Sequence, residues 1–434
     1  MAHEPRKASL LVIFLTVFID LLGFGMVLPL LPIYAKDFAQ QLGWKTEDTG
    51  LLIGALMASF SLMQLLFAPL WGRLSDRIGR RPVLMVGLAG SVVFYALFGV
   101  ATVLSSIPLL FVARVGAGIS GATIATAQAY IADATTLANR ARGMALIGAA
   151  FGLGFTFGPL FGALAVMNRT DALSPWPGYA ASILSAVALA LAYFKLPESL
   201  QADSRGAERK WLDLAALRTA VRAPSIALLL LTMFICVFSF ANFETTLSLT
   251  LHDESIGFDF GLEQVALMFA YIGLILTLAQ GGLVRRLSGK VSESALASAG
   301  AAIEIAGFLL LAQTGASGSL PMLLAALAII VTGFALINPS LNSLLSRRTD
   351  PAKQGGILGI GQSISALARI AGPLVGVPLL TNHRAAETLG LRPSALPSLL
   401  AAALMSVGLV MILAVARTGK DFATESAELG PAGE

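Results

Sequence analysis

Hydrophobic runs alternate with short polar breaks along nearly the whole chain. Each run has about 18 or more residues and few charges, which is the length an α-helix needs to cross the hydrocarbon core of a membrane. Charged residues, Pro and Gly mark the breaks. The pattern predicts twelve membrane-spanning helices, at 10-34, 50-72, 82-104, 107-131, 142-166, 178-195, 225-250, 262-284, 292-313, 319-345, 355-380 and 394-416.

Composition supports an all-α membrane protein. Hydrophobic residues make up 56% of the chain and charged residues only 12%, about half the charge of a typical soluble domain. The lone Cys236 lies within a run, which excludes an intramolecular disulfide and a metal site built from cysteine pairs. The short basic N-terminus leads into the first run without a small-residue cleavage site, so we expect a retained helix rather than a signal peptide.

The distribution of basic residues predicts the orientation. Most of the 29 Lys and Arg residues fall in the tails and in the loops after spans 2, 4, 6, 8 and 10. Basic loops stay cytoplasmic, so both termini are expected in the cytoplasm, with the chain in the plasma membrane or, in a bacterium, the inner membrane. This bias accounts for the net charge of +4, and no nucleic-acid binding is inferred from it.

The chain also repeats itself. GPLFG at Gly158–Gly162 in span 5 returns as GPLVG at Gly372–Gly376 in span 11, and the charged turn after span 2 has a weaker echo after span 8. These repeats predict two six-helix pseudo-repeats, 1-195 and 225-434, joined by a polar cytoplasmic linker at 196-224. Two halves around a central path are typical of transporters that bind substrate near the membrane midplane.

Four segments carry a family resemblance: DLLGFGMVLPLLP in span 1, APLWGRLSDRIGRRPVL after span 2, ARVGAGISGATIATAQAYIADAT in span 4 and GAAFGLGFTFGPLFGAL in span 5. With them the chain resembles the major facilitator superfamily, and within it the twelve-helix drug/proton antiporters of the tetracycline-efflux group. The resemblance implies two helical halves that rock about a central cavity. The span 5 segment, with Gly154, Gly158, Pro159 and Gly162, is similar to the motif that separates exporters from importers.

The turn GRLSDRIGRR places five charges in ten residues. Its arginines anchor it on the cytoplasmic side, and its two outer glycines permit close approach to other backbone. The resemblance implies that Asp76 faces the start of span 11, at Gly355-Gly356, and forms a latch between the halves. An ordinary positive-inside loop is the alternative. The expected latch residues are Gly72, Asp76, Arg77, Gly79, Arg80, Arg81 and Asp133.

Five ionisable residues lie within spans: Asp20, Arg114, Glu244, Glu304 and Arg369. A charge at the middle of a spanning helix costs about 2.5 to 3.5 kcal/mol, so each is a candidate functional residue. Asp20 and Arg114 lie at compatible depths, and we expect them to pair. Pairing would hold Asp20 ionised, whereas desolvation alone favours its neutral form, as a proton carrier requires.

The second half offers another charge cluster. By resemblance, Glu304 aligns with an acid of span 9 in the tetracycline exporters, and Arg369 is expected to neutralise Glu304 or Glu244. A structural ion pair is the alternative for each. The chain departs from those exporters at Leu276, where they carry a histidine, which puts tetracycline in doubt as the substrate. The three histidines, His3, His252 and His383, lie outside the spans, so buried carboxyl groups are the expected proton carriers.

Polar residues within spans are candidates for substrate binding or for bonding between helices. They are Gln64, Gln128, Asn242, Gln280, Asn338, Asn342 and Gln362.

Three classes of function follow from these features. A proton-coupled exporter of small amphipathic molecules agrees with the span 5 motif and the buried acids. A proton-coupled importer of a sugar, siderophore or organic anion would keep the same fold. A membrane enzyme would need a nucleophile with a base, or a metal cluster, within the spans, and no such set is found. No P-loop, metal site or cofactor is predicted, and a monomer with protons, substrate and lipid as partners is expected.

Overall fold

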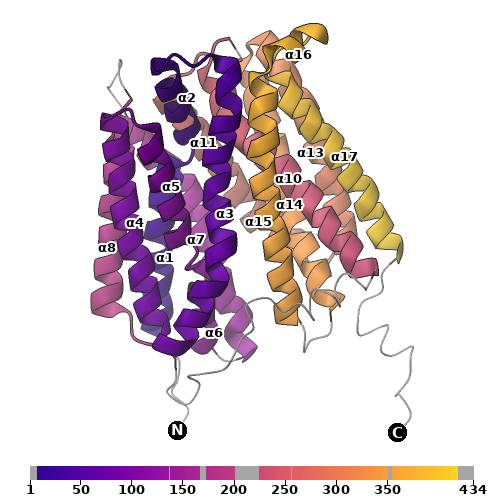
Figure 1. The fold of residues 1–434 in the computed structure, drawn as a ribbon. Helices are drawn as coiled ribbons and strands as arrows, with labels where there is room; N and C mark the ends of the chain where they lie inside the picture. Colours follow the sequence, from indigo (N-terminus) through magenta and orange to yellow (C-terminus); the bar gives the residue numbers. More distant parts are fainter. Residues whose placement is uncertain are drawn as a thin grey trace, which may run out of the picture. The chain divides into compact units, whose positions relative to one another are not determined.

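The computed structural model describes residues 7–135, 137–166, 173–200, 224–255, 257–349 and 354–418. Within these ranges the chain is almost entirely helical (Figure 1). Twelve segments are long and apolar enough to cross a membrane, in agreement with the hydrophobic runs of the sequence. Most of the expected linker, residues 201–223, lies outside the described ranges. The chain is therefore a multi-pass helical membrane protein.

Some spans consist of one helix and others of two or three consecutive helical segments. The helices are α1 (Lys7–Val27), α2 (Leu31–Gln41), α3 (Thr46–Ile78), α4 (Arg80–Val103), α5 (Ile107–Gly121), α6 (Ile124–Asp133), α7 (Leu137–Val166), α8 (Trp176–Lys195), α10 (Pro224–His252), α11 (Leu262–Leu278), the π-helix η2 (Ala279–Val284), α12 (Arg285–Leu287), α13 (Glu293–Ser317), α14 (Leu320–Arg347), α15 (Gln354–Thr381), α16 (His383–Thr388) and α17 (Ala395–Thr418).

The first span is longer than its hydrophobic run indicates. It covers Leu10–Gln41 rather than 10-34, because α2 continues the path of α1 after a break at two prolines. Pro29 and Pro32 lack the N–H that a continuous helix needs. The charged pair Lys36-Asp37 resembles a loop in sequence, but the structure buries Lys36 in an ion pair with Asp253. Neutralising this charge allows the helix to extend beyond Tyr34.

Spatial proximity divides the chain into two compact units. The first comprises Met1–Trp211 together with Leu247–Leu274, and the second comprises Leu212–Thr246 together with Ile275–Glu434. The division into 1-195 and 225-434 rests on the sequence repeats and remains a prediction. The compact units differ from it in one respect, because the end of α10 and most of α11 belong to the first unit. Close packing explains the difference: a Cβ on Gly273 would lie 2.5 Å from the carbonyl oxygen of Phe155.

The core of the first unit is built around α1. This helix packs against α7 and α8, and α4 packs against α5 and α8. Ile13, Val17 and Leu21 of α1 are buried with Tyr130 and Ile131 of α6 in one apolar cluster. The second unit is centred on α13, which packs against α14 and α17.

The repeated pentapeptide makes equivalent contacts in the two units. In the first unit, a Cβ on Gly158 of α7 would lie 2.7 Å from the α-carbon of Gly25 in α1. In the second, a Cβ on Gly372 of α15 would lie 2.8 Å from the backbone nitrogen of Asn242 in α10. Span 5 thus packs on span 1 as span 11 packs on span 7, which supports the internal repeat inferred from the sequence.

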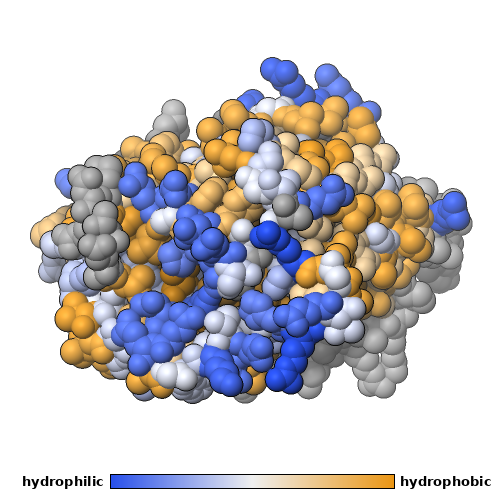
Figure 2. Space-filling view, turned by 90° about the horizontal axis from the view of Figure 1, so that it is seen from above, coloured by the Kyte–Doolittle hydropathy of each residue, from blue (hydrophilic) through white to orange (hydrophobic). Residues whose placement is uncertain are grey.

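Figure 2, seen from above the view of Figure 1, shows hydrophilic residues from the middle of this face to its lower edge, with hydrophobic residues over much of the rest. This distribution agrees with an end face that lies in water while the sides of the helices contact lipid.

Candidate functional site

The turn between α3 and α4 depends on a glycine. Gly79 has a φ of 109°, a conformation that residues with a side chain rarely adopt. A Cβ there would also collide with the carboxylate of Glu198. At Gly72, by contrast, no described atom lies within 4 Å of the position a Cβ would take. Close approach is therefore observed at Gly79 and, among the described residues, not at Gly72.

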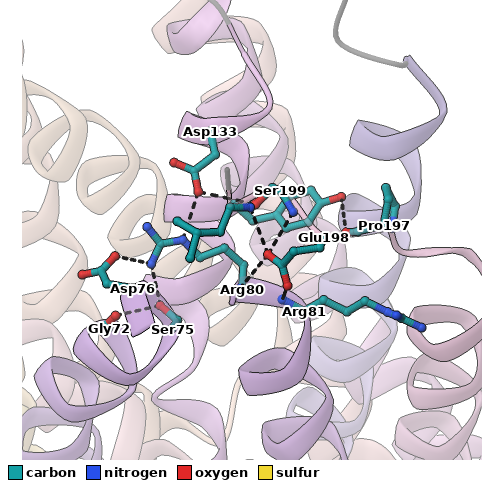
Figure 3. Close-up of polar contacts among 11 residues, drawn as sticks. Gly72, Ser75, Asp76, Arg80, Arg81, Asp133, Pro197, Glu198 and Ser199 are labelled. Atoms are coloured by element: carbon teal, nitrogen blue, oxygen red, sulfur yellow. Dashed lines mark hydrogen bonds and ion pairs between the residues drawn. The ribbon is translucent and has the colours of Figure 1, made fainter. Parts of the chain in front are cut away.

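Glu198 caps the start of α4 (Figure 3). One carboxylate oxygen accepts a hydrogen bond from the Arg80 N–H at 2.8 Å, and the other accepts one from the Arg81 N–H at 3.1 Å. The Ser199 and Leu200 N–H groups, at 2.9 and 3.0 Å, also donate to this carboxylate. A negative charge at a helix start satisfies free N–H groups and complements the helix dipole. Sequence reasoning assigned Glu198 to the linker; its only signal was an acid directly after span 6.

Arg80 joins three helices in this cluster. Its Nε donates to Asp133 of α6 at 3.0 Å, and its Nη1 donates to Ser75 Oγ of α3 at 2.6 Å and pairs with Asp76. The guanidinium group is buried, so these charge-assisted contacts are stronger than exposed ones. The structure thus brings together the three residues expected to form the latch: Asp76, Arg80 and Asp133.

The other residues of the turn point elsewhere. Arg81 donates from Nη2 to the Tyr193 carbonyl at 2.6 Å and lies over the Tyr193 ring of α8. Arg73 and Arg77 border a hollow of about 230 Å³ with Leu70 and Leu74. Within the part of the chain that the structure describes, Asp76 Oδ2 is buried and makes no hydrogen bond, so half of this carboxylate remains available for a contact outside the cluster.

Asp20 lies among hydroxyl groups in the first unit. Ser185 Oγ of α8 donates to Asp20 Oδ1 at 3.1 Å, and Ser91 of α4 lies within hydrogen-bonding reach of the same carboxylate. Thr16 and Thr123 line a cavity of about 30 Å³ beside it, which is large enough for a water molecule. Neither serine was singled out from the sequence, because a serine in an apolar run carries no distinguishing signal.

Arg114 lies against aromatic rings. Its guanidinium carbon is 4.3 Å from the centre of the Phe60 ring and 5.6 Å from that of Phe24. The described contacts of Asp20 and Arg114 therefore run to different partners, and the expected direct ion pair between them is not among these contacts. The buried Tyr95 lies within electrostatic range of both charges.

Glu304 of α13 is completely buried. Among the described residues, neither of its carboxyl oxygens has a hydrogen-bond partner. The side chain is held where α13 meets α14, since a Cβ on Gly333 would lie 2.8 Å from the Glu304 Cβ. Arg369 of α15 interacts electrostatically with Glu244 of α10. Of the two expected partners for Arg369, the structure thus places Glu244 within its electrostatic reach.

The glycines of α7 that were expected to form an exporter motif lie on the surface that meets α1. Cβ atoms on Gly154 and Gly162 would lie 2.7 Å from Leu21 Cβ and 3.1 Å from the Met26 carbonyl, respectively. Pro159 Cδ lies next to Gly25, and α7 continues through the proline. These residues thus hold two helices in close contact.

The polar residues expected to bind substrate fall into different environments. Gln64 and Asn242 donate to backbone carbonyls of Gly121 and Pro397 at 3.5 and 2.8 Å, and Asn338 accepts a bond from Asn342. These contacts favour roles in bonding between or within helices. Gln128 is exposed on α6, and Gln280 lies in the π-helix η2, a distortion that often marks functional positions.

Twelve spanning helices with acids and guanidinium groups inside them are typical of membrane transporters. The family model of the Major Facilitator Superfamily matches residues 13–373, and the chain belongs to this superfamily. Major facilitator superfamily domain-containing protein 10 from Mus musculus is 33% identical over 419 residues, which cover 86% of this chain and 88% of the relative. Tetracycline resistance protein, class C, from Escherichia coli is 32% identical over 369 residues, covering 85% and 88% of the two chains.

Solved structures support the same fold. The crystal structure of the human organic anion transporter MFSD10 (TETRAN) matches with a TM-score of 0.69 at 29% identity and covers 94% of this chain and 99% of the other. A D-xylose-proton symporter matches with a TM-score of 0.75 at 16% identity, covering 96% and 98% of the two chains. The second similarity concerns the fold alone.

Proposed function

We propose that the protein exports small amphipathic molecules in exchange for protons by alternating access. The observation that carries this proposal is Glu304, a completely buried carboxyl group whose oxygens have no hydrogen-bond partner within the described residues. An ionised carboxylate is very costly in such surroundings. The group can carry its charge only in a conformation that brings water or a cation to it. Its protonation is thereby linked to the movement of the helices.

Asp20 is the second proton-linked acid in this proposal. It borders a cavity of water size and is held by hydroxyl groups, so a proton has both a path and an acceptor. In this proposal, Arg114 and Tyr95 influence electrostatically how readily Asp20 takes up a proton. A proton that arrives from outside neutralises Asp20 and lets the cavity turn inward, and its release to the cytoplasm restores the charge.

The polar cluster at the α3–α4 turn serves as the cytoplasmic latch. Arg80 fixes Asp76 by an ion pair at one oxygen, which leaves the other for the start of span 11. A contact worth a few kcal/mol is enough to set which face is closed. In this orientation both termini lie in the cytoplasm, and the protein works as a monomer in the plasma membrane.

Transport of an organic anion is the second candidate. Arg114 sits over two aromatic rings, a combination that suits an aromatic or amphipathic anion. The similarity to a human organic anion transporter at 29% identity favours the same class. Import of such an anion with a proton is compatible with this candidate, so direction must be measured.

Vesicle transport tests both candidates. Purified protein in proteoliposomes is given a panel of cationic dyes, tetracyclines and aromatic anions, with and without a pH difference. We expect accumulation of at least one amphipathic compound when the interior is acidic, and no accumulation when the gradient is dissipated. Accumulation driven only by an acidic exterior would support the importer instead, and transport that ignores the gradient would exclude proton coupling.

A further inference from the structure

A buried ion pair lies at the end of the first unit that is distant from the α3–α4 turn. Lys36 of α2 is 7% exposed, although lysine is almost never buried unless it is paired. Its ammonium group contacts Asp253 Oδ2. The helix α3 separates this pair from the turn, since it begins soon after α2 and runs for 33 residues, or roughly 50 Å at the helical rise.

Both oxygens of Asp253 are occupied. Oδ1 accepts hydrogen bonds from the Ser255 N–H at 2.9 Å and from Ser255 Oγ at 2.6 Å, while Oδ2 faces Lys36. Backbone hydrogen bonds also join the described residues on either side of Asp253, because the Phe258 and Phe260 N–H groups donate to the carbonyls of Thr250 and Leu251 at 2.9 Å. These bonds and those from Ser255 position the carboxylate that faces Lys36.

On the side of α2, the helix is also held firmly. Tyr34 donates from its hydroxyl to the Ser174 carbonyl at 2.7 Å, and both Tyr34 and Phe38 are buried. The adjacent acid, Asp37, accepts a bond from Gln41 instead. His252, next to Asp253, bonds to the Phe260 carbonyl through Nδ1. Asp37 also interacts electrostatically with Lys36, but the direct contact of the ammonium group is with Asp253.

The pair joins segments that are far apart in sequence. Asp253 belongs to Leu247–Leu274, the part of α10 and α11 that is assigned to the first unit, whereas both helices continue into the second. The ion pair therefore fastens this part of the two helices to α2. Gly273, which packs on Phe155 and Thr156 of α7, provides a second contact at the other end of the segment.

We propose that Lys36 and Asp253 are two further residues of the transport machinery and form the outer gate. The ion pair closes the face opposite the α3–α4 turn by holding Leu247–Leu274 against α2, and it must separate each time this face opens. The inference rests on alternating access, but not on the nature of the driving ion, the substrate or the direction of transport.

The energetics of a buried pair predict how the gate responds to substitution. Removing one partner leaves the other charge buried and unpaired, which is strongly unfavourable. Opening this face would hydrate the remaining charge. A single substitution should therefore shift the population towards the open gate, whereas exchange of the two charges should restore closure.

Accessibility of a buried cysteine tests the gate without substrate or a proton gradient. Leu251, completely buried next to the pair, is replaced by Cys in a Cys236→Ala background and labelled with a membrane-impermeant maleimide in proteoliposomes. Lys36→Ala and Asp253→Asn should each accelerate labelling about tenfold, which corresponds to about 1.4 kcal/mol. Lys36→Asp with Asp253→Lys should label at the parent rate.

Two further points keep the test decisive. Asp253→Asn preserves the side-chain volume, and Lys36→Arg, which keeps the charge, should fold and label at the parent rate. Unchanged labelling in Asp253→Asn, or labelling of the exchanged variant as fast as that of Asp253→Asn, would overturn the gate. Because the assay contains no substrate or pH gradient, its failure would leave proton-coupled export standing, and the reverse also holds.

Discussion

Asp20 and Glu304 are both acids within spans, but their surroundings differ. Asp20 has serine hydroxyl groups and a small cavity beside it, whereas Glu304 is enclosed without a described hydrogen-bond partner. The cavity beside Asp20 has room for a water molecule. We therefore expect the two acids to exchange protons at different points of the transport cycle.

Glu304→Gln should lower proton-driven transport at least about tenfold while leaving the folded protein intact, because it removes the titratable group and keeps the side-chain volume. Transport in proteoliposomes with an imposed pH difference measures the effect, and size-exclusion chromatography verifies folding. Glu293→Gln, at the start of the same helix and in contact with Arg347, is the matched control and should keep its proton dependence. Full proton dependence in Glu304→Gln would remove this residue from the coupling mechanism.

Asp20→Asn should abolish uphill transport and its pH dependence even where substrate still binds. An asparagine can keep the bond to Ser185 but cannot take up a proton. Accumulation against a gradient at several pH values is the measurement, and ligand-induced thermal stabilisation reports binding. Asp48→Asn, an exposed acid at the start of α3, should behave like the parent. If Asp20→Asn still accumulates substrate with the parent pH profile, the coupling role passes to Glu304 or Glu244.

For single residues, the sequence indicated which charged side chains lie within spans, but not which residues contact them. A charge within an apolar run is conspicuous, so Asp20, Arg114, Glu244, Glu304 and Arg369 were found from the sequence alone. Ser91, Ser185 and Tyr95 are ordinary residues of membrane helices, and only the packing of α1, α4 and α8 brings them together. The expected ion pair of Asp20 and Arg114 rests on depth along the helices, and it stays a prediction.

Among the helices, close packing depends on glycines at specific positions. Gly158 of α7 meets the backbone of α1 and has no room for a Cβ. At Gly148 of the same helix, no described atom lies within 4 Å of the position that a Cβ would take. The spacing of glycines along a helix does not show which neighbouring helix each one meets, so this difference is known only from the structure.

Gly158→Ala should therefore destabilise the protein by about 1 to 3 kcal/mol, since the added methyl group must displace Gly25. Gly148→Ala, in contrast, should be neutral or stabilising by up to about 1 kcal/mol, because alanine favours the helix. Thermal unfolding in detergent, followed by tryptophan fluorescence, compares the pair. Equal stability of the two variants would mean that α1 and α7 separate readily at this point.

The start of α4 shows another limit of sequence reasoning. Arg80, Asp76 and Asp133 were expected to meet, and the structure brings them together at Ser75. The cap from Glu198 was not expected, since 118 positions separate it from Arg80. A hydrophobic pattern shows where a helix starts, but not which distant residue satisfies its free N–H groups.

For the whole molecule, the pattern of hydrophobic runs was sufficient to predict twelve spans, and four motif segments indicated the superfamily. The pattern did not predict where the first span ends, because Lys36 is buried in an ion pair with Asp253, which is distant in sequence. Substrate identity follows from the shape of a cavity, to which many helices contribute one or two side chains each. No single stretch of sequence records that shape.

Asp76→Asn should reduce transport turnover and shift the population towards the inward-open form while membrane insertion stays intact, because it removes the charge expected to face span 11. Cross-linking between cysteines at the cytoplasmic ends of spans 2 and 11 should become less efficient. Glu47→Gln, at the opposite end of α3, serves as the control. Normal transport together with unchanged cross-linking in Asp76→Asn would contradict the latch.

The repeated pentapeptide has a consequence for the history of this chain. GPLFG and GPLVG differ at one position, although most of the two halves no longer match by eye. Both copies lie where a Cβ would press on the backbone of another helix. After a duplication, most positions in a membrane helix can drift among apolar residues, but a position with no space admits no larger side chain. The same residues are therefore kept in both copies where the helices are in contact.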